Sequence, residues 1–199
     1  MLEEEKGRCE NIGVRLAPYL FTWNLQRFKE YVKRSEKFDV KKYFKDLGDI
    51  LNKLKNNEKF KNLFKSLKDL RLDKHEIPKE DVENLFISLH RKLRKIGIGQ
   101  SEPVMTIKIL HTLSPNFFPL LDNNILNALK KKGKCNVSMS GKGYVRWMEY
   151  LQTWLKNYPN AISTLKKELN RSILKLVDEL LYITSSVKLK NYVDKLEIC

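Results

Sequence analysis

Apolar residues recur every three or four positions through most of this 199-residue chain. The clearest example lies in residues 39–56, where the apolar side chains would share one side of a helix: Val40, Tyr43, Phe44, Leu47, Ile50, Leu51 and Leu54. This spacing matches the turn of an α-helix, whereas a half-buried strand alternates at every second residue. No alternating stretch occurs, so the sequence predicts an all-α protein.

The predicted helices follow one another along the whole chain. We expect them over residues 24–37, 39–56, 58–70, 78–96, 101–113, 143–157 and 160–184, with one beginning at Asp122 and a short one within 187–199. Ser101 is the expected cap of the helix that has Pro103 in its first turn. No Gly/Ser-rich linker separates them, so we predict a single domain, 1–199, of about seven to nine helices. A division into an N-terminal lobe, 12–76, and a C-terminal lobe, 77–199, is the alternative.

The composition supports a folded protein in the cytoplasm. Hydrophobic residues make up 42% of the chain, which is ample for a core. The longest apolar runs are far shorter than the roughly 20 residues that span a bilayer. The N-terminus is acidic and polar, unlike a secretory signal. We therefore expect a cytoplasmic protein without a membrane partner.

Potential metal ligands are scattered along the sequence. They comprise three cysteines and three histidines: Cys9, Cys135, Cys199, His75, His90 and His111. None of them pairs with another at the short spacings typical of zinc sites or redox motifs. The sequence therefore predicts no metal and no cofactor.

The charge is the strongest indication of a partner. Lys and Arg number 39 against 24 Asp and Glu, which gives a net charge of +15. Such a protein attracts polyanions, and DNA or RNA is the most common of these. The alternative is a lysine-rich surface that only keeps the protein in solution.

The segment KILHTLSPNFFPLLDNNI, residues 108–125, interrupts the helical pattern. Pro115 and Pro119 each disfavour helical geometry at the residue before them, so the chain has to turn. Asp122 follows, directly before another apolar-periodic stretch, where its carboxylate can accept a backbone N–H as a helix cap. The sequence predicts a corner between two helices, with Asp122 either as a structural cap or as a catalytic residue.

A basic loop leads into the helix predicted over 143–157. Its sequence, KKKGKCNVSMSGKGY (residues 130–144), holds five lysines and three glycines. Glycines let backbone amides approach an anion, and a helix N-terminus favours phosphate. No Walker spacing is present, so nucleotide hydrolysis is not predicted; a solvated loop is the alternative. The nucleic-acid contacts that we expect are Lys108, Lys131, Lys132, Lys134, Lys142, Gly97, Gly99, Gly141, Gly143 and Arg146.

The order of residues around the corner is similar to that in an uncharacterised family of small prokaryotic helical proteins. The shared features are Lys108-Ile-Leu-His111, Pro115, Phe118-Pro119 and Asp122-Asn-Asn-Ile125, followed by GYVRWMEYLQ at residues 143–152. The resemblance covers residues 98–155. It implies a helical fold but no function.

The chain also distantly resembles the helix-hairpin-helix DNA glycosylases. In that superfamily a Gly-x-Gly hairpin opens a helix, and a loop then delivers a catalytic aspartate at the start of the next one; Gly97-Ile-Gly99, the helix over 101–113 and Asp122 have the same order. The lyase lysine of the bifunctional members is missing, because the chain reads Gln100-Ser-Glu-Pro103 there. The resemblance implies a lysine-free glycosylase with an aromatic pocket for an extruded base. The candidates for that pocket are Trp23, Phe117, Phe118, Trp147 and Trp154.

Three functions remain open from the sequence. The leading hypothesis is a nucleic-acid-binding helical protein of undefined role that contacts phosphates through its basic surface. The alternative is a base-excision enzyme that uses Asp122. The third is an interaction protein whose basic surface meets an acidic protein.

Overall fold

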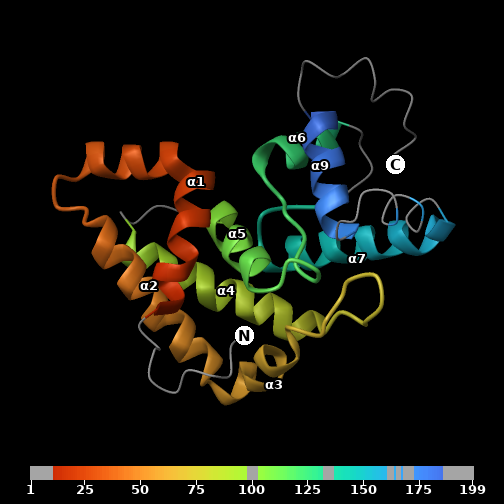
Figure 1. The fold of residues 1–199 in the computed structure, drawn as a ribbon, viewed down its shortest axis with the longest axis horizontal. Helices are drawn as coiled ribbons and strands as arrows, with labels where there is room; N and C mark the ends of the chain where they lie inside the picture. Colours follow the sequence, from red (N-terminus) through yellow and green to blue (C-terminus); the bar gives the residue numbers. More distant parts are fainter. Residues whose placement is uncertain are drawn as a thin grey trace.

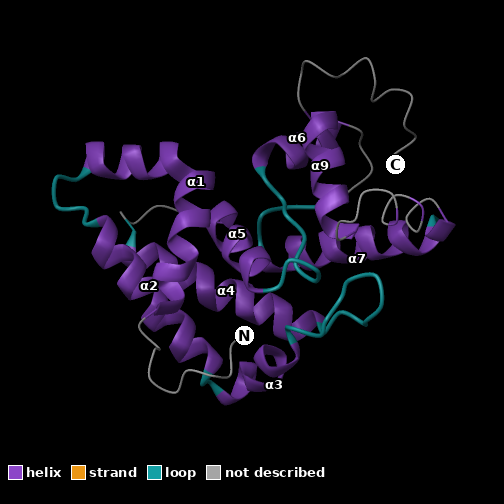
Figure 2. Ribbon diagram, viewed as in Figure 1, coloured by secondary structure: helices purple, strands orange, loops and turns teal. Residues whose placement is uncertain are grey.

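The computed structural model describes residues 11–97, 103–131, 137–160, 164, 167 and 173–185. All regular secondary structure in these residues is helical (Figure 2), which confirms the all-α prediction. None of the described helices combines the length and the apolar character needed to cross a membrane. The described helices are α1 (Asn11–Arg34), α2 (Val40–Lys55), α3 (Glu58–Ser66), α4 (Lys79–Ile96), α5 (Pro103–Leu113), α6 (Asn123–Lys131), α7 (Gly141–Asn157) and α9 (Ile173–Ser185).

Helix α4 is the central element of the fold (Figure 1). It contacts α2 and α3 on one side and α5 and α7 on the other, and α1 closes the structure against α2 and α5. Helices α6 and α9 pack against each other beyond α7 (Figure 1). One hydrophobic core runs through all of these helices. The single domain, and the division into lobes 12–76 and 77–199 as its alternative, stay predictions.

Helix α2 follows the sequence prediction closely. Asp39 is its N-cap, with one carboxylate oxygen 3.0 Å from the backbone nitrogen of Lys42, and Asn56 is its C-cap. The predicted apolar stripe is buried except for Val40, which is half-buried. Local capping and periodicity suffice here because both act within one turn of the helix.

The first helix differs from its prediction. We expected 24–37, but α1 begins at Asn11, continues through Pro18 and ends at Arg34. Leu16 and Leu20 are buried in the core, so packing outweighs the backbone hydrogen bond that proline cannot make. Helix α1 is bent into two limbs (Figure 1).

Smaller differences concern helix ends. Helix α3 stops at Ser66 rather than at residue 70, and the hydroxyl of Ser66 donates back to Leu63 O at 3.0 Å. Helix α7 begins at Gly141 instead of Gly143, because Ser140 caps it by accepting from the amide of Gly143 at 3.1 Å. Of the helix predicted over 160–184, the structure describes α9 and isolated residues before it. Ser101 and the segment 187–199 lie outside the described residues.

Candidate functional site

The predicted corner exists, and side chains from α7 and α9 hold its backbone. Residues 114–122, called the corner from here on, join α5 to α6. Tyr144 and Trp147 of α7 donate to the carbonyls of Pro119, at 2.8 Å, and Leu120, at 3.0 Å. The amide of Leu120 donates to Asp178 of α9 at 3.3 Å. The corner is therefore built by contacts from distant parts of the chain.

The other side of the corner is fastened to the segment after α3. Ser114, which is buried, donates its hydroxyl to Leu67 O at 2.8 Å, and Leu72 donates its amide to Asn116 O at 3.0 Å. From α7, the side-chain nitrogen Nε2 of Gln152 donates to Leu72 O at 2.8 Å and to His75 O at 2.7 Å. These bonds satisfy backbone groups that a nonhelical segment would otherwise bury without partners.

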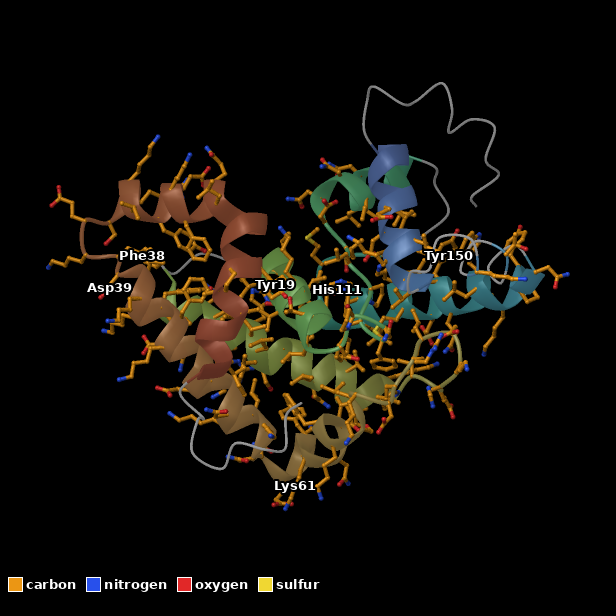
Figure 3. The ribbon with its side chains drawn as sticks, in the orientation of Figure 1. Tyr19, Phe38, Asp39, Lys61, His111 and Tyr150 are labelled. Atoms are coloured by element: carbon orange, nitrogen blue, oxygen red, sulfur yellow. The ribbon has the colours of Figure 1, made fainter. Side chains whose placement is uncertain are left out.

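His111 and Asp178 form a buried pair beneath the corner. Figure 3 shows His111 at the centre of the molecule. Its Nε2 lies 3.9 Å from Asp178 Oδ2, and the two side chains are only 7% and 6% exposed. Burial raises the pKa of Asp178 to about 7 and lowers the pKa of His111 below its ordinary value. Burial likewise raises the pKa of Tyr144 on α7 well above its ordinary value.

The sequence does not predict this pair: His111 is isolated from other potential ligands along the chain, and Asp178 is not among the candidate site residues. The sequence does contain one indication that Asp178 is buried. Leu174, Val177, Asp178 and Leu181 have the three- and four-residue spacing of one helix face, so Asp178 interrupts an apolar stripe. A carboxylate at such a position has to find partners inside the fold.

Asp122 is the N-terminal cap of α6, which was one of the two roles predicted for it. Its Oδ1 accepts from the backbone N–H of Ile125 at 2.8 Å. The side chain is half-buried, and its charge helps to raise the pKa of Asp178 nearby. Catalysis by Asp122 stays a prediction.

We expect Asp122→Ala to lower the free energy of unfolding by about 1 kcal/mol, because the amide of Ile125 loses its acceptor. Asp122→Asn keeps an acceptor oxygen and should change stability by less than half as much. Urea unfolding of the three proteins measures the difference. Equal losses for alanine and asparagine would show that the carboxylate acts through its charge and not as a cap.

The basic loop is only partly described. Lys132, Lys134 and Gly99 lie outside the described residues, and Lys131 is the last residue of α6. Lys142 and Arg146 are exposed at the start of α7, whereas Lys108 is half-buried on α5. The structure thus places Lys142 and Arg146 together on one helix, and Lys108 on another.

The glycines predicted to cradle a phosphate have packing roles. A Cβ at Gly141 would lie 3.0 Å from the carbonyl oxygen of Glu83 on α4. A Cβ at Gly143 would overlap the backbone and side chain of Ser138. Gly97 ends α4, and its amide donates to Leu93 O at 3.0 Å. The need for glycine at 141 and 143 is therefore explained by close contacts within the chain.

No protein-family model, curated protein or solved structure matches this chain. The two family resemblances drawn from the sequence therefore stay predictions.

The aromatic residues proposed for a base pocket are mostly core. Phe117, Phe118 and Trp147 are fully buried, Trp154 is half-buried, and the side chain of Trp23 is not described. One pocket, between α6, α7 and α9, has apolar and aromatic walls: Leu129, Trp147, Tyr150, Leu151, Trp154, Val177 and Leu181. Among the described residues, the surface that lines it is apolar and presents no polar group to the edge of a base. Within the described residues, no three potential metal ligands come together.

Proposed function

We propose that this protein binds nucleic acid through the exposed lysines of α2, α3 and the residues that follow α3. Residues 41–68 contain nine lysines and three acidic residues, a net charge of +6 in this stretch alone. All nine lysines are exposed, and together they are called the α2–α3 lysine face: Lys41, Lys42, Lys45, Lys53, Lys55, Lys59, Lys61, Lys65 and Lys68.

The observation that carries the proposal is that eight of these nine lysines have no ion pair within the described residues. Among the described residues, only Lys61 of the nine has an ion pair, with Glu58 at 2.9 Å. Lys61 points outward at the edge of the molecule (Figure 3). Ammonium groups that are not neutralised within the protein can bind phosphates and release the counterions of a nucleic acid, which is the main source of nonspecific affinity.

The same face indicates how the nucleic acid would be recognised. The exposed large hydrophobic residues in the described part of the chain lie on other segments: Tyr19, Leu25, Val32, Ile87 and Tyr158. The lysine face therefore has no exposed aromatic ring on which a base could stack. We expect contacts to the phosphates alone, and hence little discrimination between sequences.

Binding of a short DNA duplex at several salt concentrations tests the proposal. We expect affinity to fall steeply between 50 and 200 mM salt, and substitution of four face lysines to weaken binding on the order of 100-fold at the lower salt and reduce the salt slope by about 3. Absence of binding at low salt would contradict the proposal. The four substitutions are Lys41→Gln, Lys45→Gln, Lys53→Gln and Lys59→Gln.

A charge-matched variant serves as the control. It removes four other exposed lysines and should weaken binding much less, because only long-range charge is lost. A third variant, Lys142→Gln with Arg146→Gln, tests the contact predicted from the sequence at the start of α7. Equal losses in the first two variants would show that net charge, and not this face, governs binding. The control substitutions are Lys37→Gln, Lys74→Gln, Lys95→Gln and Lys156→Gln.

A further inference from the structure

The hydrogen bonding of His111 determines which of its nitrogens carries a proton. Nδ1 lies 2.7 Å from the carbonyl oxygen of Phe118. A carbonyl can only accept, so Nδ1 must be the donor. In the neutral imidazole, Nε2 is then a lone-pair acceptor, and it faces Oδ2 of Asp178 at 3.9 Å.

Asp178 of α9 also has only an acceptor to offer on the side that faces His111. Its Oδ1 accepts from the amide of Leu120, but its buried Oδ2 has no hydrogen-bond partner in the described structure. An ionised carboxylate is also only an acceptor. Two acceptors therefore face each other in the core unless one proton lies between them, on Oδ2 or on Nε2.

The surroundings favour an uncharged pair over an ion pair. Burial raises the pKa of Asp178 more than any other influence, and the neighbouring carboxylates of Glu179 and Asp122 act in the same direction. Burial likewise lowers the pKa of His111; the hydrogen bond to the Phe118 carbonyl opposes this, and the Lys175 ammonium adds to it. The hydrogen bond from the Leu120 amide and the Lys175 ammonium oppose the rise at Asp178. Tyr144 of α7 is neutral, because burial raises its pKa well above the ordinary value, and its hydroxyl donates to Pro119 O. The carboxylic acid form leaves no net charge in the core.

We propose that Asp178 keeps its proton in the folded protein below neutral pH, with Oδ2–H directed towards Nε2 of His111 on α5, and that this uncharged pair helps to hold α9 against α5 and the corner. Loss of the proton leaves an ionised carboxylate facing the imidazole lone pair and weakens the docking of α9. The device couples the packing of one helix to a single proton.

The effect on stability has a defined sign. The folded-state pKa of Asp178, about 7, is above its ordinary value of 3.8, so its contribution is fully present below pH 3.8 and is lost as the pH rises to about 7. The pKa of His111 is lowered, so its contribution is lost as the pH falls below 6.5. The two changes oppose each other in the wild-type protein. A comparison that cancels the histidine is therefore needed.

Asp178→Asn provides that comparison, because its amide group imitates the protonated acid at every pH. Its oxygen can accept from Leu120, and its nitrogen presents N–H groups, in place of a carboxylate oxygen, to His111 Nε2. We expect the ratio of the wild-type unfolding equilibrium constant to that of Asp178→Asn to rise about 100-fold between pH 5 and pH 8. The ratio should rise about tenfold per pH unit until pH 7 and then level off. Urea unfolding at the two pH values measures it.

An ion pair would give the opposite result. Asparagine would then be destabilising at both pH values, with no gain relative to wild type at pH 8, and this outcome would overturn the proposal. Asp49→Asn, which removes an exposed carboxylate from α2, is the matched control and should show almost no change in this ratio.

Hydrogen exchange tests whether the effect is local to α9. At pH 8 we expect amides of residues 173–185 to exchange faster in the wild type than in Asp178→Asn, while those of α2 differ less. Equal exchange rates of the α9 amides in the two proteins at pH 8 would contradict the proposal that this pair stabilises the packing of α9.

Discussion

Replacing Phe118 with alanine is expected to lower the free energy of unfolding by about 4 kcal/mol. The ring is fully buried and packs edge-on against Phe117, with their centroids 5.0 Å apart. The corner around it cannot collapse into the space, because hydrogen bonds from α5, α7 and α9 hold its backbone on both sides. A cavity left in such a rigid site is near the costly end of the range.

Chemical denaturation of Phe118→Ala and Phe118→Leu measures this effect. Leucine fills most of the volume and should cost less than half as much as alanine. The backbone carbonyl that accepts from His111 is present in both variants, so the comparison isolates the ring. A loss of less than 1 kcal/mol for alanine would show that the corner can repack.

Those parts of the fold that depend on neighbouring residues could be predicted from the sequence. Asp39, Asp122 and Pro78 each mark a helix start, and the signal lies within one turn of the residue itself. Pro18 shows the limit of such rules. Its position argues for a boundary, but the burial of Leu16 and Leu20 on the same helix decides otherwise.

The centre of the candidate site could not be predicted because its partners are far apart in the sequence. Asp178 meets an amide 58 positions away, and Gln152 meets carbonyls 77 and 80 positions away. No local spacing encodes such pairs. The polar residue on the apolar stripe of α9 indicates only that a partner exists.

The corner and the lysine face have different roles. The corner resembles a functional motif because prolines, aromatics and an aspartate are concentrated there. Its phenylalanines are buried in the core, however, Ser114 donates to the carbonyl of Leu67, and Asp122 accepts from the amide of Ile125. The lysines of residues 41–68 are not among the contacts predicted from the sequence, because they alternate with a regular apolar stripe. Their exposure makes them the better candidates for contact with a polyanion.

Gly13→Ala is expected to cost about 3 kcal/mol, since the added methyl group has no space between α1 and α2. A Cβ at this position would overlap the carbonyl oxygen of Phe44 and lie 2.7 Å from the backbone nitrogen of Gly48. Both obstacles are backbone atoms of α2, so no side chain can rotate away. The two helices would have to separate.

The sign of this effect makes the test decisive. Within a helix, alanine is favoured over glycine by about 1 kcal/mol, so propensity alone predicts stabilisation. Gly97→Ala is the control, because the φ of Gly97 is −78°, which any residue adopts. Thermal and urea unfolding should show a loss for Gly13→Ala and little change for Gly97→Ala. A stabilised Gly13→Ala would mean that α1 does not lie this close to α2, and the buried positions of Leu16 and Leu20 would then need another explanation.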